Sequence, residues 1–200
     1  MFARRPTLLY PKQAPCLSRK VFNLSKAIKS LESKGSSSSA QTYTIIKKFN
    51  HPQPLIYELV SRVDLYHEFI PYCTSSFITE RSPITNEPTI AGLRVGFQAF
   101  DEEFSCDLQC ERPKLVIAKS ITHSLFQFLE TEWEIKAVDK NQSVATLNLK
   151  YEFKSQLYNK VSSLFAKKVA SLMTKAFEKR AFEVSRDVNE MDKYTTFIEK

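Results

Sequence analysis

The feature that most constrains the fold is a change in the spacing of apolar residues near residue 155. Before it, apolar and polar side chains alternate with a period of two, which is typical of antiparallel strands with one buried and one wet face. Short turns separate these segments and no helical pattern intervenes, so the sequence predicts a meander of neighbouring strands. The alternating inward positions are Phe104, Cys106, Leu108 and Cys110, then Leu129, Thr131, Trp133, Ile135 and Ala137, then Ala145, Leu147, Leu149, Tyr151 and Phe153.

From Gln156 to about Asn189 the apolar period becomes helical and predicts one long helix. Most of its lysines and arginines fall off the apolar stripe, so this helix needs a sheet face to cover. The stripe consists of Val161, Phe165, Val169, Leu172, Met173, Ala176 and Phe177.

The segment before the meander predicts a first strand at Thr42 to Phe49, followed by a helix. The prolines around residue 53 suit a helix start, the apolar stripe runs from Leu55 to Tyr66, and Pro71 ends the helix. This order of elements predicts an α+β fold, in which a curved antiparallel sheet wraps around the long C-terminal helix and leaves an internal apolar pocket.

The net charge of +7 is confined to the N-terminal part of the chain. Residues 1–40 hold eight basic residues against one acid, Glu32, and the remainder is neutral. Residues 1–34 have the basic, acid-poor, Ser-bearing composition of a mitochondrial transit peptide. We therefore expect a transit peptide at 1–34, a Ser-rich linker at 35–40, a folded domain at 41–189 and a tail at 190–200. A neutral body also argues against nucleic acid as a partner.

Candidate chemical groups are scattered rather than clustered. The three histidines, His51, His67 and His123, occur in unrelated contexts, so we expect no metal site and no cofactor. Cys106 and Cys110 share a strand face about 13 Å apart, too far for a disulfide, and are expected to be free thiols. The glutamates near residues 102 and 132 fall on the solvent-exposed faces of their strands by alternation, so they would not enter an internal pocket as acid/base groups. The sequence therefore favours a binding protein over an enzyme.

Five motifs resemble the coenzyme Q-binding proteins of the START-like, polyketide-cyclase-like superfamily, and the similarity covers roughly residues 42 to 185. They are V-D-L-Y-H-E-F-I-P-Y-C from Val63, L-R-V-G-F from Leu93, E-E-F-S from Glu102, Y-E-F-K-S-Q-L from Tyr151 and A-F-E-K-R from Ala176. The resemblance implies a helix-grip fold, with ubiquinone (coenzyme Q) and its polyprenyl tail bound in an internal pocket. It also implies a non-enzymatic chaperone or carrier needed for respiratory electron transport and efficient quinone biosynthesis.

The resemblance further implies a peripheral position on the matrix side of the mitochondrial inner membrane, with respiratory or quinone-synthesis complexes as possible partners. Tyr72 departs from the family pattern, which commonly has tryptophan there, and Ser124-Leu125-Phe126 replaces a common Gly-Pro-Phe. Two alternatives stay open: a cyclase-like enzyme acting on an aromatic precursor, and a protein-interaction module like ribosome-associated bacterial relatives.

The predicted ligand-binding wall combines the inward strand residues with the stripe of the long helix. It comprises Leu93, Val95, Phe97, Phe104, Cys106, Leu108, Trp133, Leu147 and Leu149, faced by Val161, Phe165, Val169, Leu172 and Met173. A second set is expected to contact the membrane at the pocket mouth, because apolar residues there could enter a bilayer and lysines attract anionic lipid. This set is Phe69, Tyr72, Lys167 and Lys168.

Overall fold

The structure, a computed structural model, describes residues 40–97, 100–122, 126–187 and 194, with the backbone alone for Phe97, Phe100 and 156–170. The chain divides into two units, Met1–Ser33 and Lys34–Lys200, and all described residues lie in the second. The expected transit peptide, nearly all of the linker and the C-terminal tail apart from Tyr194 therefore fall outside the described residues.

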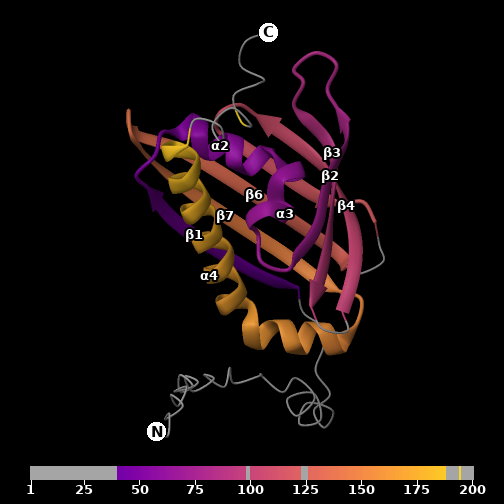
Figure 1. Cartoon of the computed structure of the whole chain (residues 1–200). Coiled ribbons are helices and arrows are strands. Elements are labelled where there is room, and N and C mark those ends of the chain that lie inside the picture. Colours follow the sequence, from indigo (N-terminus) through magenta and orange to yellow (C-terminus); the bar gives the residue numbers. More distant parts are fainter. Residues whose placement is uncertain (1–39, 98–99, 123–125, 188–193, 195–200) are drawn as a thin grey trace, which may run out of the picture. The chain divides into compact units, whose positions relative to one another are not determined.

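The core of the fold is a seven-stranded antiparallel sheet in the order β1-β7-β6-β5-β4-β3-β2 (Figure 1). Each strand from β2 to β7 pairs with the next along the chain, as expected for a meander, and β1 closes the row against β7. The strands are β1 Gln41–Phe49, β2 Cys73–Arg81, β3 Pro88–Phe97, β4 Phe100–Glu111, β5 Leu115–Ser120, β6 Phe126–Asp139 and β7 Gln142–Phe153.

The predicted helix after the first strand is interrupted, which corrects the sequence-based prediction of one continuous stripe. The helix α2 (Gln53–Ser61) ends at Arg62, a single 3-10 turn η1 (Val63–Leu65) follows, and α3 (Tyr66–Phe69) is one short turn. Arg62 leaves the helical conformation, with φ −79° and ψ 64°. The Tyr66 hydroxyl then donates a 2.6 Å hydrogen bond to the Val60 carbonyl, which lies in the last turn of α2.

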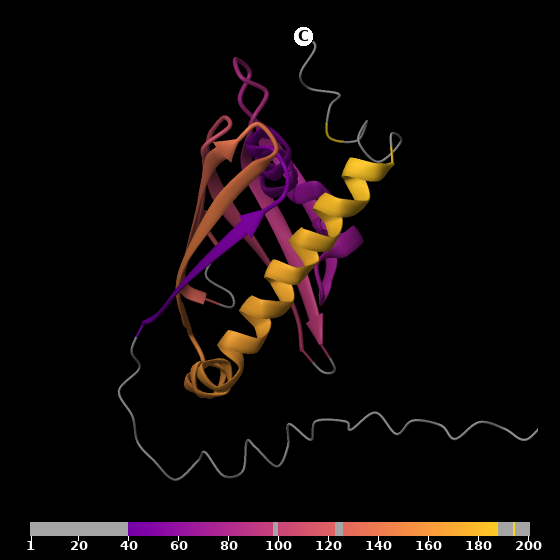
Figure 2. The same ribbon diagram turned by 90° about the vertical axis from the view of Figure 1, so that its left-hand side faces the viewer.

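The helix α4 (Gln156–Arg186) crosses the concave side of the sheet, and Figure 2 shows the sheet curling around it. Phe177, Ala181 and Val184 are buried on one side of this helix. Lys47 of β1 and Glu178 of α4 form an ion pair of 2.8 Å. The predicted α+β arrangement of a curved antiparallel sheet gripping a long C-terminal helix is confirmed.

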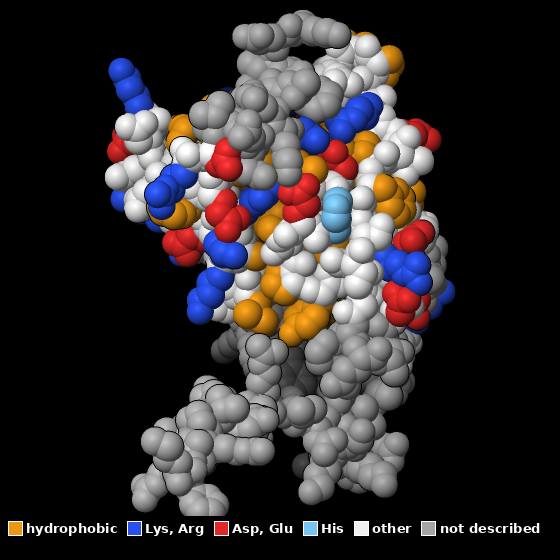
Figure 3. All heavy atoms as spheres, viewed as in Figure 1, with side chains coloured by type: hydrophobic (Ala, Val, Ile, Leu, Met, Phe, Trp, Pro, Cys, Tyr) orange, Lys and Arg blue, Asp and Glu red, His pale blue; other side chains and the backbone are white. Residues whose placement is uncertain are grey.

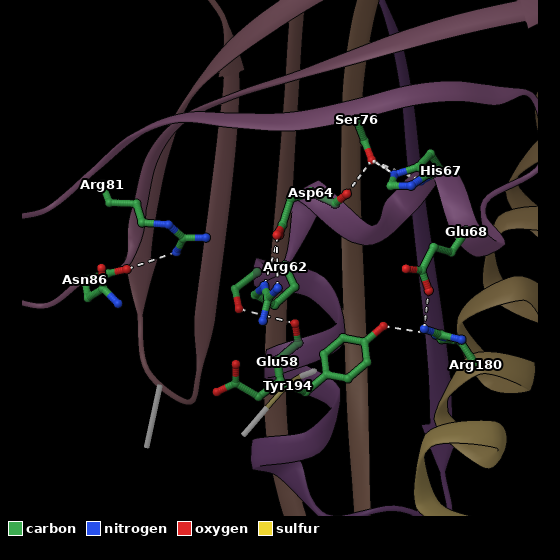
Figure 4. A network of polar contacts seen from close by, with 11 residues as sticks. Glu58, Arg62, Asp64, His67, Glu68, Ser76, Arg81, Asn86, Arg180 and Tyr194 are labelled. Atoms are coloured by element: carbon green, nitrogen blue, oxygen red, sulfur yellow. Dashed lines mark hydrogen bonds and ion pairs between the residues drawn. The ribbon is translucent and has the colours of Figure 1, made fainter. Parts of the chain in front are cut away.

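A network of polar contacts joins the helices on the side away from the sheet (Figure 4). The guanidinium of Arg180 on α4 pairs with Glu68 of α3 at 2.6 Å and donates to the Tyr194 hydroxyl at 3.0 Å. Arg62 forms two 3.0 Å hydrogen bonds to the carboxylate of Asp64. The network fixes α3 against α4, where the two helices cover the sheet.

Candidate functional site

The space between the sheet and the helices holds an apolar cavity of about 440 Å³. Pockets for small organic ligands are typically about 300–1,000 Å³, so this one can hold a ligand of that class. Its described lining is Ile45, Val60, Val63, Tyr66, Ile70, Pro71, Tyr72, Cys73, Ala91, Leu93, Val95, Phe104, Cys106, Leu108, Val116, Ala118, Phe126, Leu129, Thr131, Trp133, Leu147, Leu149, Tyr151, Phe153, Met173 and Phe177.

One end of the cavity is closed by α2. There Gln53 donates a 2.7 Å hydrogen bond to the Ile135 carbonyl, and the Ser143 hydroxyl donates at 2.9 Å to the His51 carbonyl. Ile135 and Ser143 are almost completely buried. Tyr72 marks the other end: it is the one lining residue of the described set that is exposed, at 48%. The cavity therefore has a closed end under α2 and a mouth beside Tyr72.

No Asp, Glu, Lys, Arg or His is among the described residues that line the cavity. The buried charged residues lie elsewhere and are paired: Glu58 and Glu87 both contact Arg112, and Arg180 contacts Glu68. Among the described residues no group of three or more His, Cys, Asp or Glu side chains could hold a metal ion. The cavity wall thus offers apolar surface and a few neutral polar groups, which suits solvation of a lipid better than acid/base chemistry.

The described cysteines, of which Cys73 and Cys106 line the cavity, are protonated thiols because burial raises their pKa values. Burial raises the pKa of Cys106 to about 11, and burial together with Glu87 raises the pKa of Cys110 to about 12. A nucleophilic cysteine needs a lowered pKa, so these thiols are unsuited to covalent catalysis. Cys73, Cys106 and Cys110 are all free, as the spacing predicted for the last two.

The structure brings most of the predicted wall together around this cavity. The predicted residues that line it are Leu93, Val95, Phe104, Cys106, Leu108, Trp133, Leu147, Leu149 and Met173. Leu172 is half-buried and does not line it, because a helix turns its side chains by about 100° per residue and Met173 takes the facing position. The side chains of Phe97, Val161, Phe165 and Val169 lie outside the described residues.

The segment between α3 and β2 also forms cavity wall, a contribution that the strand alternation could not reveal. Ile70, Pro71, Tyr72 and Cys73 all line the cavity. Tyr72 holds a left-handed backbone conformation, with φ 68°, and its carbonyl accepts a 2.9 Å hydrogen bond from Gly96. The only sequence signal was the concentration of apolar residues at the end of a predicted helix.

Of the residues expected to contact a membrane, Tyr72 is exposed. Figure 3 shows hydrophobic side chains gathered on the surface below α3. Phe69 is half-buried instead: its ring packs edge-on against Tyr66 and Phe177, with centroids 5.7 and 5.3 Å apart. The side chains of Lys167 and Lys168 lie outside the described residues.

Comparison with known proteins places the chain in a family. Residues 49–178 match the family described as "Polyketide cyclase / dehydrase and lipid transport". The chain is 42% identical to the mitochondrial coenzyme Q-binding protein COQ10 of Eremothecium gossypii, over 92% of this chain and 91% of that protein. This chain belongs to the COQ10 family. It is also 44% identical to the COQ10 protein of Saccharomyces cerevisiae, over 73% of each chain.

Solved structures of low sequence identity share the fold. A START superfamily protein from Mycobacterium smegmatis aligns with a TM-score of 0.65 at 16% identity, over 72% of this chain and 98% of its own. The Zhui aromatase/cyclase from Streptomyces sp. R1128 aligns with a TM-score of 0.64 at 11% identity, over 75% and 98%. The COQ10 family member described here therefore has the START-like helix-grip fold that the motifs implied.

Proposed function

We propose that this chain binds coenzyme Q in the cavity between sheet and helices. The observation that carries the proposal is the cavity of about 440 Å³ with an apolar wall and no charged residue among those described. A polyprenyl quinone is mostly hydrocarbon, so its transfer from water into such a wall is favourable by the hydrophobic effect. Two relatives more than 40% identical to this chain are named coenzyme Q-binding proteins, which gives the ligand class.

The bound quinone is carried rather than transformed. Acid/base catalysis needs a titratable group within hydrogen-bond reach of the reacting atom, and the described wall offers neutral side chains with raised thiol pKa values. The chain then acts as a chaperone that presents quinone to respiratory or quinone-synthesis complexes and supports respiratory electron transport and efficient quinone biosynthesis.

The proposed location is the matrix side of the mitochondrial inner membrane, with the chain bound peripherally. The relatives are named mitochondrial, and residues 1–34 have transit-peptide composition. No helix among the described residues has the length and apolar character needed to cross a bilayer. The exposed Tyr72 at the mouth would meet the membrane surface, so that quinone passes between lipid and cavity without crossing water.

The experiment is a matched pair of substitutions on β5. Ala118 lines the cavity and Lys119 is exposed, because neighbouring strand residues face opposite ways. Ala118→Phe should fill the cavity and abolish uptake of coenzyme Q from loaded liposomes, whereas Lys119→Phe should leave uptake unchanged. Circular dichroism checks that both full-length variants fold. Normal uptake by a folded Ala118→Phe variant would contradict the proposal.

A further inference from the structure

Two neutral polar residues, Thr131 and Trp133, lie next to each other on the cavity wall. Both point inward from β6, two residues apart and hence about 7 Å from each other along the strand. Thr131 stands between Ala118 and Leu149 in the sheet, and Trp133 between Val116 and Leu147. All four of these neighbours are apolar and also line the cavity.

The hydrogen-bonding groups of this pair are free. Within residues 40–97, 100–122, 126–187 and 194, neither the Thr131 hydroxyl nor the Trp133 indole N–H forms a hydrogen bond. Other polar groups of the wall are occupied: the Tyr66 hydroxyl donates to the Val60 carbonyl at 2.6 Å and that of Tyr151 to Gln41 at 3.2 Å.

A ligand group placed at Thr131 and Trp133 meets two hydrogen-bond donors and one acceptor, the Thr131 oxygen. An indole N–H only donates, a threonine hydroxyl donates or accepts, and the Cys106 thiol is weak in both roles. The matching ligand group is a carbonyl oxygen in an otherwise apolar body. A hydroxyl in its place would bring a further proton. If the Thr131 oxygen accepts this proton, the proton of Thr131 itself loses its acceptor, so one donor stays unpaired in an apolar cavity at a cost in free energy.

The depth of the pair fixes the direction in which such a ligand enters. Along β6, Trp133 is two residues from Ile135 at the closed end, and Phe126 pairs with Phe153 at the other end of the strand. Leu129 and Tyr151, which pair with each other, lie between Thr131 and that end. A carbonyl-bearing head at Thr131 and Trp133 would therefore leave a hydrocarbon tail running toward the mouth at Tyr72.

We propose that Thr131 and Trp133 form the head-group subsite of the cavity, where they donate hydrogen bonds to a quinone carbonyl and select the oxidised quinone over the quinol. This inference rests on the proposed function, because it assumes that the cavity takes coenzyme Q. The subsite would orient the bound coenzyme Q, with its head group deep in the cavity and its tail at the mouth. It would also give the cavity a preference for the oxidised form.

Trp133 is the only tryptophan of the chain, so its fluorescence reports on the cavity directly. Binding of coenzyme Q to the full-length chain is followed by quenching of this emission, in the native protein, in Thr131→Val and in Thr131→Ser. Loss of one neutral hydrogen bond should weaken binding by about three- to tenfold. We expect weaker quinone binding in Thr131→Val and native-like quinone binding in Thr131→Ser. Squalene is a polyisoprenoid without a head group, and its affinity is measured by its competition with the quinone. Its affinity for Thr131→Val should equal its affinity for the native chain.

The redox preference is tested with Trp133→Phe, which keeps an aromatic ring beside Phe177 but removes the N–H. Uptake of oxidised and reduced coenzyme Q from liposomes under anaerobic conditions is measured by solvent extraction of the protein. The native chain should favour the oxidised form by about three- to tenfold, and the preference should shrink in Trp133→Phe.

Failure of the subsite and failure of the proposed function give different results. Equal uptake of both redox forms by the native chain, or an unchanged preference in Trp133→Phe, would overturn the subsite. So would an unchanged quinone affinity in Thr131→Val, or an equal loss for quinone and squalene. Absence of any binding by the native chain would instead overturn the proposed function itself.

Discussion

Arg180 of α4 places its Nη2 atom 2.6 Å from Oε2 of Glu68 on α3, and the Arg180 side chain is only 8% exposed. Directly beside this pair, Phe69 of α3 packs on Phe177 of α4, which lines the cavity. The guanidinium also lies 5.7 Å from the centre of the Phe69 ring. The contact between α3 and α4 therefore combines an ion pair that lies away from the cavity with an aromatic contact that faces it. Together they close the helical wall of the cavity.

Replacing Glu68 with Gln should lower the free energy of unfolding by about 1–3 kcal/mol, because the largely buried Arg180 guanidinium loses the nearer of its two carboxylates, the other being Glu183 at 3.9 Å. Urea denaturation of the full-length chain measures the change. Lys179→Gln on α4 is the control: the ion pair of Lys179 with Glu183 is highly exposed and should contribute less than about 1 kcal/mol. Equal effects of the two substitutions would show that burial of the Arg180 pair is energetically unimportant.

The raised pKa of Cys106 predicts a loss of stability in alkali. An unfolded cysteine titrates near 9 and the folded one near 11, so the folded state holds its proton more tightly. The resulting stabilisation is fully present below pH 9 and is lost as the pH rises to 11, by roughly 2–3 kcal/mol in total.

The measurement compares the native chain with Cys106→Ala. This variant has no thiol to titrate, and its packing defect lowers the free energy of unfolding by the same amount at every pH. The stability difference between them, followed by urea denaturation, should shrink from pH 9 to pH 11. A difference that stays constant over this range would mean that the Cys106 thiol titrates normally in the folded protein.

Gly92 is required by a close aromatic neighbour. Phe77 on β2 is its pairing partner, and a Cβ atom at Gly92 would lie 2.3 Å from the Phe77 Cζ atom. Gly92→Ala should therefore destabilise the chain by about 1–3 kcal/mol through overpacking. In a double-mutant cycle, Phe77→Leu should remove most of this cost; additive effects of the two substitutions would exclude the steric explanation.

The membrane-contact proposal is tested at the two ends of one hairpin. Tyr72 immediately precedes β2, whereas Ile84 lies beyond its far end and is 92% exposed. Nine strand residues separate them, or about 30 Å. Tyr72→Asp should reduce binding to anionic liposomes at least about tenfold, and Ile84→Asp should not.

Aspartate is a suitable replacement at position 72, because it tolerates the left-handed backbone conformation found there. Sedimentation with liposomes gives the bound fraction, and circular dichroism confirms the fold. A larger effect of Ile84→Asp would place the membrane contact at the opposite end of the molecule.

The sheet side of the cavity could be predicted from the sequence because alternation decides which face each strand residue takes. Phe104, Leu108 and Leu147 line the cavity as predicted, since the strands are long and their period is regular. The START-like fold was also predictable, from the change of period near residue 155 and from the five motifs. The short turn between β6 and β7 was expected as well, because only a few residues separate the two alternating segments.

The helical side was predicted less well, for a physical reason. A helical stripe is wider than the part of it that faces one cavity, so Leu172 and Met173 looked equivalent although Met173 alone lines the cavity. The interruption at Arg62 involves local hydrogen bonds that the apolar pattern does not reveal, namely from Arg62 to Asp64 and from Tyr66 to Val60. The closing of the cavity by α2 depends instead on contacts between distant segments.

Binding of coenzyme Q is tested most directly by identifying what the cavity holds. The full-length chain is purified from a host that makes quinone, and is analysed by native mass spectrometry and by organic extraction. We expect coenzyme Q in near-stoichiometric amount in the native chain, lost in Ala118→Phe and kept in Lys119→Phe. A folded protein that carries no quinone, and takes none up from quinone-loaded liposomes, would contradict this expectation.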